Sequence, residues 1–330
     1  MFGIKVHKKD AQKVIKKLRK KSLISKDYKI KRDDNFVYIP IKKIPGNLNY
    51  EIVDIEFEKI KKEPRSFIDL LEGKLKKEEI KKIKKSFDII GDIVIIEVPE
   101  ELEKYKKLIG KAVLEFTKRK AVYMKKSKIK GIKRIRDLEH LAGEKISETI
   151  HQEYGTRIML DVKKVYFSPR LATERERVAS QVKDGEVVVD AFAGVGPFSL
   201  AIARKKKAKK IYAIDINPDA IHYLKKNIKL NKAYEIIPIQ GDTRKVLEDL
   251  KIKYDRIIMN LPAKAHEFLD VALKFLKKGG VIHYYEFSKN FDTPINRIKE
   301  YASNVKILNK RKVKSKSPGV WHIAIDAKIL

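Results

Sequence analysis

The most constraining feature of the sequence is the segment VVVDAFAGVGPF at residues 187–198. Its apolar run predicts a buried strand that ends at Asp190, and its glycines predict a turn in which the backbone passes close to a ligand. The proline after the second glycine is typical of the first turn of a helix. This strand, turn and helix predict a binding site for a cofactor at the end of the strand.

The residue types at this turn indicate which cofactor is bound. A dinucleotide fingerprint would have a third glycine at position 199, where this chain has Ser199. The Asp190 carboxylate suits an ammonium group better than a phosphate, because it accepts hydrogen bonds and carries negative charge. S-adenosylmethionine has an ammonium group on its amino-acid moiety. We therefore predict that it is bound by Asp190, Phe192, Gly194 and Gly196.

Two further predicted strands also end at acidic residues. The run IYAIDINP places Asp215 and Ile216 at the end of the second strand, where a carboxylate can accept hydrogen bonds from both ribose hydroxyls. The run IPIQGD places Asp242 and Thr243 at the end of the third, beside the expected adenine. The alternative is that these carboxylates only cap helices. Three acidic strand ends in succession favour cofactor binding.

The fourth predicted strand is followed by Asn260, Leu261 and Pro262, where methyltransferases position the methyl acceptor. Enzymes that methylate exocyclic amines of bases usually have Asn-Pro-Pro and then an aromatic residue. Here Leu261 and Ala263 take the second and fourth positions. This difference argues against an exocyclic amine as the acceptor.

The order of elements predicts the fold class. Strands are expected at 187–189, 211–214, 236–239, 256–259 and 281–285, with helices between them and a closing hairpin at 305–309 and 320–327. This is an α/β pattern. It predicts a Rossmann-like class I methyltransferase domain over 164–330, with a mostly parallel seven-stranded sheet.

Two smaller α+β domains are predicted before it. Residues 1–60 should contain a helix from Asp10 and strands near 36–40 and 52–57, and the charged, proline-containing segment 59–65 is the best linker candidate. Residues 66–163 should contain helices near 76–85 and 99–118, a strand at 92–98, and an extended run at 149–162 that turns at Tyr154 and Gly155. The first domain is expected to dock a large substrate.

The formal charge of the chain is +33, from 77 basic and 44 acidic residues, and points to a polyanionic partner such as RNA. A lysine-rich, cysteine-free composition is also typical of proteins from hot environments, so part of this charge needs no ligand. The basic run at 125–136 is either a solvated loop or an RNA contact. We predict RNA contacts from Lys125, Lys126, Lys128, Lys130 and Arg136.

Other classes of site are disfavoured. The chain has no cysteine, and its seven histidines are dispersed without ligand spacing, so we predict no disulfide and no metal. The apolar runs are far shorter than the ~20 residues of a membrane span, and the first ten residues lack a signal-peptide core. We therefore expect a cytoplasmic protein with no membrane association.

Several segments resemble the archaeal and eukaryotic tRNA guanine-37 N1-methyltransferases. They are RIRDLEHLAGE, KVYFSPRLATERERV, VVVDAFAGVGPFS, IYAIDINPDAI, IIMNLP and GGVIHYYEF, which follow one another in the family's order over residues 134–287. The first domain also looks like the family's N-terminal domain. The resemblance implies S-adenosylmethionine-dependent methylation of N1 of guanosine 37, the nucleotide 3′ of the anticodon in tRNA.

The resemblance also implies roles for single residues. Glu174 matches the general base that removes the N1 proton, and Arg134 matches the group that stabilises negative charge on O6. Asn260 would orient the guanine edge, Arg175 would contact the cofactor, and Tyr166 and Pro262 would wall the pocket. We add Arg170 as a substrate contact. Some relatives have glycines where this chain has Ala172 and Thr173, which puts the reach of Glu174 in question.

Other functions stay open at this point. The chain could also methylate the wyosine intermediate at position 37, could methylate ribosomal RNA, or could bind RNA without catalysis. Glu174 could be a helix-start carboxylate, and Arg134 a phosphate contact. We expect a monomer that contacts the anticodon arm and the outer corner of tRNA, and the sequence implies no protein partner.

Overall fold

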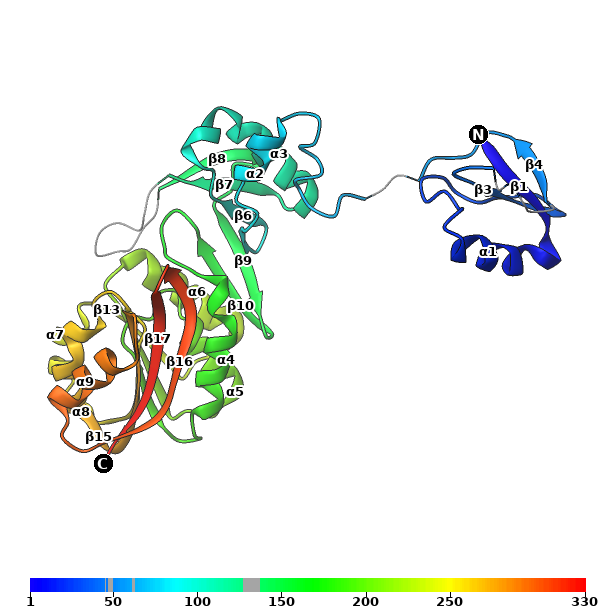
Figure 1. Cartoon of the computed structure of the whole chain (residues 1–330). Helices are drawn as coiled ribbons and strands as arrows, with labels where there is room; N and C mark the ends of the chain where they lie inside the picture. The colour runs from blue at the N-terminus through cyan, green and yellow to red at the C-terminus, as the bar shows by residue number, and fades with distance from the viewer. Residues whose placement is uncertain (45, 47–49, 61–62, 127–136) are drawn as a thin grey trace. The chain divides into compact units, whose positions relative to one another are not determined.

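A computed structural model describes residues 1–330 except 45, 47–49, 61–62 and 127–136 (Figure 1). The chain forms two compact units, Met1–Ser66 and Phe67–Leu330, each with its own core. Within the described residues, no helix is both long and apolar enough to cross a membrane.

The first unit is a four-stranded antiparallel sheet with one helix packed against it. Its elements are β1 (Phe2–His7), α1 (Ala11–Lys20), β2 (Lys31–Arg32), β3 (Phe36–Pro40) and β4 (Glu51–Asp54), in the sheet order β2-β3-β1-β4. Val14 and Leu18 of α1 are buried against the sheet, as the helical spacing predicts. Asp10 precedes α1 as expected, but its side chain makes no capping hydrogen bond.

The second unit begins with a mixed four-stranded sheet. Its elements are α2 (Lys77–Lys82), β5 (Asp88–Ile90), β6 (Ile93–Ile96), α3 (Lys106–Thr117), β7 (Ala121–Lys125) and β8 (Leu138–Gly143). The sheet order is β5-β6-β7-β8, and only β6 and β7 run parallel. The predicted helix at 99–118 is a 3₁₀ segment, Glu100–Tyr105, followed by α3.

A two-residue hairpin joins β9 (Glu148–Glu153) to β10 (Thr156–Asp161). Tyr154 and Gly155 turn the chain with φ of 45° and 85°, the left-handed pair that a tight hairpin favours. The hairpin is fixed to helix α6 (Pro218–Asn231), because Asn227 and Asn231 each hydrogen-bond the backbone amide and carbonyl of a β10 residue. The predicted turn is confirmed, and strand β10 packs on a helix that covers the large sheet.

The large sheet has seven strands in the order β13-β12-β11-β14-β15-β17-β16. The strands are β11 (Val187–Asp190), β12 (Lys210–Asp215), β13 (Ile236–Gln240), β14 (Tyr254–Met259), β15 (Leu276–Ser288), β16 (Val305–Ser317) and β17 (Val320–Ile329). The first five named in chain order run parallel, and β17 is antiparallel to both of its neighbours. The sheet is therefore mixed, and β17 is the strand that runs against its neighbours.

Helices cover both faces of this sheet (Figure 1). One apolar core contains residues of α4 (Ala172–Gln181), α5 (Pro197–Lys205) and α6, and the other contains residues of α7 (Thr243–Leu250), α8 (Leu269–Phe275) and α9 (Asp292–Tyr301). The closing hairpin is longer than predicted. The lysine-rich β16 is an edge strand of the sheet. Most of its side chains are polar, so its sequence lacks the apolar alternation from which a strand is predicted.

Candidate active site

The glycine turn after β11 has the backbone that its sequence predicts. Gly194 and Gly196 have φ of 57° and 87°, values that favour glycine. A Cβ on Gly196 would lie 2.3 Å from Cδ1 of the buried Leu224, whereas one on Gly194 would come no nearer than 4.0 Å, to the Tyr166 carbonyl oxygen. Gly196 therefore allows α5 and α6 to pack, and Gly194 leaves space beside Tyr166.

Asp190 ends β11 with a carboxylate that is fully buried. Its Oδ2 accepts a hydrogen bond from the Ser199 hydroxyl at 2.8 Å, and its Oδ1 has no hydrogen-bond partner within the described part of the chain. Burial, with a contribution from the negative charge of Asp215, raises the pKa of Asp190 to about 7. A buried acceptor that lacks a donor fits the ammonium group of S-adenosylmethionine.

The next two acidic strand ends have local partners. Asp215 accepts hydrogen bonds from the backbone amides of Gly194, at 2.7 Å, and Asn217, at 2.8 Å, so it joins β12 to the glycine turn. Asp242 caps α7 by accepting from the amides of Arg244 and Lys245. The helix-capping alternative is therefore correct for Asp242 as one role, and cofactor contacts by both carboxylates stay predictions.

The other predicted cofactor contacts surround these ends. Thr243 is buried, and its hydroxyl donates to the carbonyl of Ala191 next to Asp190. The Phe192 ring meets the Phe268 ring edge to face, with centroids 5.1 Å apart. Ile216 is 40% exposed directly after Asp215, which offers an apolar surface at the edge where the cofactor is expected.

The predicted acceptor residues follow β14. The Asn260 side-chain oxygen is buried and has no hydrogen-bond partner among the described residues. A ligand with an N–H or O–H group could therefore donate a hydrogen bond to it. Pro262 is buried, and its carbonyl accepts the Phe287 amide at 3.0 Å, which fixes the loop to β15. Asp190 ends β11, and Asn260 follows the neighbouring parallel strand β14, so two of the unpaired buried oxygens lie at the ends of adjacent strands.

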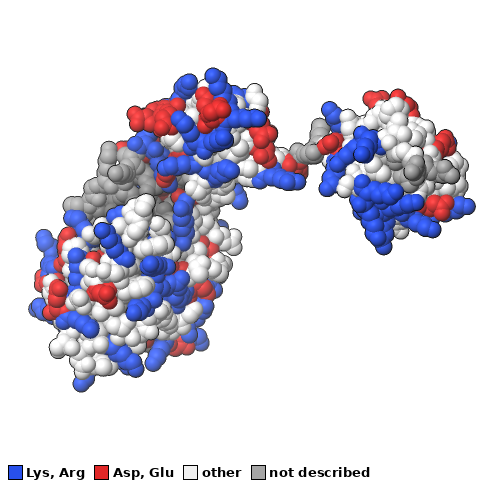
Figure 2. All heavy atoms as spheres, viewed as in Figure 1, with Lys and Arg blue, Asp and Glu red and all other residues white. Residues whose placement is uncertain are grey.

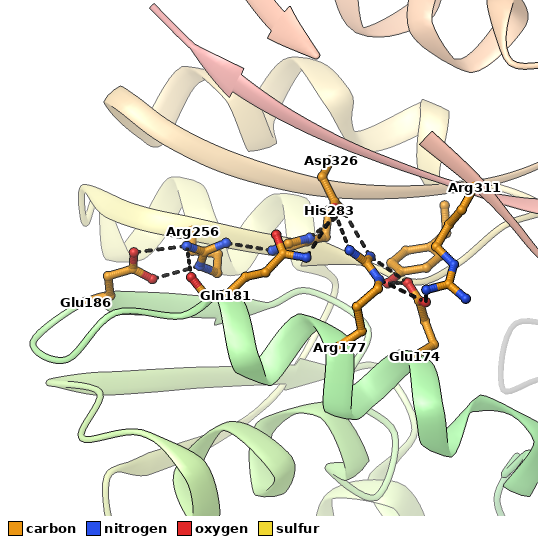
Figure 3. A network of polar contacts seen from close by, with 9 residues as sticks. Glu174, Arg177, Gln181, Glu186, Arg256, His283, Arg311 and Asp326 are labelled. Carbon is orange, nitrogen blue, oxygen red and sulfur yellow. Dashed lines mark hydrogen bonds and ion pairs between the residues drawn. The ribbon is translucent and has the colours of Figure 1, made fainter. Parts of the chain in front are cut away.

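Glu174 lies in the first turn of α4 and is 2% exposed. Its carboxylate accepts hydrogen bonds from the Arg177 guanidinium at 2.7 and 3.1 Å (Figure 3). It also accepts one from the Tyr285 hydroxyl at 2.8 Å. Arg311 of β16 lies 3.4 Å from the same group. The Tyr285 ring also packs on Phe198, which follows the glycine turn. Tyr285 thus joins Glu174 to the cofactor end of the sheet.

The predicted basic contacts form ion pairs within the chain. Arg175 is buried and donates both to Glu153, at 2.6 and 2.8 Å, and to the Ser168 carbonyl. Arg170 and Lys125 both pair with Asp88, at 2.6 and 3.4 Å. Lys125 also pairs with Glu97, and Lys126 with Glu139. Their roles toward cofactor or RNA stay predictions. Lys128, Lys130, Arg134 and Arg136 lie outside the described residues.

Comparison with known proteins identifies the family. Three family models match: the TRM5/TYW2 methyltransferase domain at 149–309, the TYW2 N-terminal domain at 67–146 and the tRNA methyltransferase 5 N-terminal domain at 3–49. The tRNA (guanine(37)-N(1))-methyltransferase Trm5b of Pyrococcus abyssi is 48% identical, over 99% of both chains. The chain belongs to the TRM5/TYW2 methyltransferase family. The resemblance seen in the sequence is therefore confirmed.

Relatives within the TRM5/TYW2 family carry different activities in their names. A solved complex of aTrm5 with tRNALeu is 44% identical, covers all of both chains and has a TM-score of 0.90. The tRNA(Phe) (4-demethylwyosine(37)-C(7)) aminocarboxypropyltransferase of Methanocaldococcus jannaschii is 42% identical, over 72% of this chain and 96% of its own. Two group-transfer reactions thus occur on this family's fold.

Several residues around Glu174 were missed by the sequence reasoning. Arg177, His283 and Asp326 are joined to it through a network of hydrogen bonds (Figure 3). Tyr285 also donates a hydrogen bond to it. One signal was available: His283 and Asp326 each interrupt an apolar strand, and a buried polar residue in such a strand needs a partner.

Proposed function

We propose that this chain transfers a methyl group from S-adenosylmethionine to N1 of guanosine 37 in tRNA. The observation that carries the proposal is the match over 99% of both chains to a protein named for this reaction, which includes the tRNA methyltransferase 5 N-terminal domain at 3–49. The aminocarboxypropyltransferase match covers only 72% of the chain. Methyl transfer is therefore favoured over aminocarboxypropyl transfer.

The proposed cofactor site lies at the carboxyl ends of β11, β12 and β13. Asp190 would take the ammonium group, Asp215 the ribose hydroxyls, and Gly194 and Gly196 the close backbone approach. Phe192, Ile216, Asp242, Thr243, Asn260 and Arg175 would complete it. When bound, the cofactor supplies an electrophilic methyl group on a sulfonium.

The proposed chemistry follows from the acceptor atom. N1 of guanine carries a proton, so a base must remove it as N1 attacks the methyl group. We propose Glu174 as this base, Arg134 as the group that stabilises charge on O6, and Asn260 as the group that orients the guanine edge. Tyr166 and Pro262 would wall the pocket. The unpaired Asn260 oxygen supports this, since a guanine edge offers N–H donors.

The proposed RNA partner accounts for the positive charge. Figure 2 shows basic side chains gathered over α1, where the exposed residues are Lys13, Lys16, Lys17, Arg19 and Lys20. Phosphate contacts of this kind position RNA without reading its sequence. We propose the outer corner of tRNA for residues 1–60, and the anticodon arm for 66–163 and 164–330, with Arg170 and Lys125 to Arg136 as contacts. The enzyme would act as a cytoplasmic monomer.

Substitution of Glu174 tests the proposal on a tRNA transcript with guanosine at position 37. Glu174→Gln should lower the single-turnover rate about 10²- to 10⁴-fold, the range of general-base effects, with S-adenosylmethionine affinity almost unchanged. Glu176→Gln is the matched control, because Glu176 lies on the same helix but pairs with Arg204 and Lys205. It should keep the wild-type rate.

The identity of the product completes the test. Nucleoside analysis should find 1-methylguanosine at position 37. An aminocarboxypropyl adduct on a transcript with the wyosine intermediate, or methylation of ribosomal RNA alone, would reject the proposed reaction. Methylation of that intermediate as well would extend it. Equal rates for Glu174→Gln and wild type would reject only the role of Glu174.

A further inference from the structure

Glu174 is one end of a chain of charged groups that runs from α4 through β17 and β15 to β14 (Figure 3). Carboxylates and guanidinium groups alternate along it, with one histidine between them. The members are Glu174, Arg177, Asp326, His283, Arg256 and Glu186. Arg311 contacts its Glu174 end. The network therefore contains three carboxylates and three guanidinium groups.

Arg177 bridges the two carboxylates nearest the proposed active site. Its Nε and Nη2 donate to Glu174 at 3.1 and 2.7 Å, and its Nη1 and Nη2 donate to Asp326, the latter at 3.1 Å. Glu174 and Asp326 are both almost fully buried. A planar guanidinium that binds two carboxylates in this way has a fixed orientation. Arg177 therefore fixes the position of Glu174 relative to the sheet.

The far side of the network fixes the protonation of His283. The Arg256 guanidinium can only donate hydrogen bonds. His283 Nε2, which lies 2.8 Å from Arg256 Nη1, must therefore accept one. His283 Nδ1 then carries the proton and donates to Asp326 Oδ1 at 2.7 Å. Burial lowers the pKa of His283, which agrees with a neutral ring. Although burial acts to raise it, hydrogen bonds from His283 and Arg177 hold the pKa of Asp326 well below its ordinary value.

Proton transfer changes the charge at only one end of this network. As the N1–H bond breaks, an O–H bond forms on Glu174, and the electron pair left on N1 forms the new N–C bond with loss of the neutral thioether. Glu174 then no longer balances the charge of Arg177. Asp326 remains paired with Arg177, so the buried guanidinium is not left without an anion, which would be costly.

We propose that Arg177, anchored by Asp326 and His283, is the positioning residue for Glu174: it fixes the carboxylate in place and keeps a positive charge beside it. The inference rests on the proposed role of Glu174 as the base. Arg177 favours the anionic carboxylate, and Asp326 opposes this by sharing the same guanidinium. The two residues therefore have opposite effects on the proton affinity of the base.

In the described part of the chain, the charged or titratable groups that face Glu174 or its immediate partners all enter this balance. Arg177 comes from α4, Tyr285 from β15 and Arg311 from β16. The His322 ring of β17 packs on Tyr285, with centroids 5.4 Å apart. Gln181 adds a neutral donor to Asp326 at 3.2 Å. Among the described residues, Asp326 alone contributes a second negative charge next to Arg177.

The test is the pH profile of the single-turnover rate at saturating tRNA and S-adenosylmethionine. Arg177→Gln should slow the reaction and move the acid limb of the profile upward by about one pH unit or more, because a neighbouring cation is lost. Asp326→Asn should also slow it, but should move the acid limb downward. Arg177→Lys keeps the positive charge and should leave the acid limb of the profile in place. It should still lower the rate, because lysine cannot make the bidentate contact with Glu174.

Controls separate this inference from the proposed function and from unfolding. Arg204→Gln removes an arginine that pairs with Glu176 on the same face of the sheet and should leave the profile unchanged. If Glu174→Gln keeps the wild-type rate, the base assignment fails. The other outcome is that Glu174→Gln is inactive, while Arg177→Gln and Asp326→Asn move the acid limb of the pH profile in the same direction or leave it unmoved. That result overturns only the positioning role of Arg177. Should Arg177→Gln not fold, Arg177→Lys and Asp326→Asn still decide: an unmoved limb in Asp326→Asn overturns the inference.

Discussion

The buried carboxylate of Asp190 predicts that cofactor binding depends on pH. Its Oδ1 lacks a hydrogen-bond partner within the described part of the chain, and its pKa is raised to about 7 by burial. An ammonium group placed beside it would favour the ionised form. Binding should therefore release a proton at and below neutral pH, and the affinity for S-adenosylmethionine should fall as the pH falls.

The size of the effect follows from the pKa of the free protein. If the ammonium group lowers the pKa of Asp190 to well below 6 in the complex, the dissociation constant should rise about tenfold between pH 8 and pH 6, which is ~1.4 kcal/mol. The folding stability depends on pH with the opposite sign to the cofactor affinity: the contribution of Asp190 to stability falls as the pH rises. Because the pKa of Asp190 in the folded protein is raised above the ordinary aspartate value of about 3.9, its contribution to stability is present below that value and is lost as the pH rises toward 7.

Calorimetric titration in buffers with different ionisation enthalpies measures both the affinity and the number of protons released. The matched ligand is 5′-methylthioadenosine, which lacks the amino-acid moiety and should bind with an affinity that does not depend on pH. Asp190→Asn should weaken S-adenosylmethionine binding at pH 8 and remove its pH dependence. The same slope for both ligands, or a wild-type slope in Asp190→Asn, would refute the assignment of the ammonium group to Asp190.

Two further predictions follow from the packing and from the two compact units. Gly196→Ala should lower the free energy of unfolding by more than Gly194→Ala, because the new Cβ meets Leu224 at 2.3 Å and overpacking of this kind costs about 1–3 kcal/mol; equal losses in thermal unfolding would contradict the steric reason. Deletion of residues 1–66 should raise the dissociation constant for tRNA more than it slows methylation at saturating tRNA, and a filter-binding affinity equal to that of the full chain would disprove the docking role.

The parts of the molecule that sequence could predict are local ones. Strand β11, the glycine turn and the start of α5 follow from one run of residues, and the hairpin turn at Tyr154 and Gly155 follows from two. Hydrophobic periodicity and backbone preferences determine such features within a few residues. For the same reason, the buried carboxylate at the end of β11 could be placed before its surroundings were known.

The network around Glu174 could not be predicted in this way. Tyr285 is 111 residues from Glu174, and Asp326 is 149 residues from Arg177. Their contacts depend on the order of β15 and β17 in the sheet, which no single segment determines. Sequence reasoning could treat Glu174 only as a carboxylate at the start of a helix, whereas its partners decide what it can do.

The run ERER in α4 shows how the fold gives similar side chains different roles. Glu174 and Arg177 are three residues apart and lie on one face, toward β15 and β17. Arg175 pairs with Glu153 of β9, and Glu176 pairs with Arg204 and Lys205 of α5. Since each residue of a helix turns by about 100°, these four consecutive charged residues face three directions, toward strands β15 and β17, strand β9 and helix α5. Two glutamates two positions apart are therefore not interchangeable: one lies in the buried network proposed for proton transfer, and the other links α4 to the next helix.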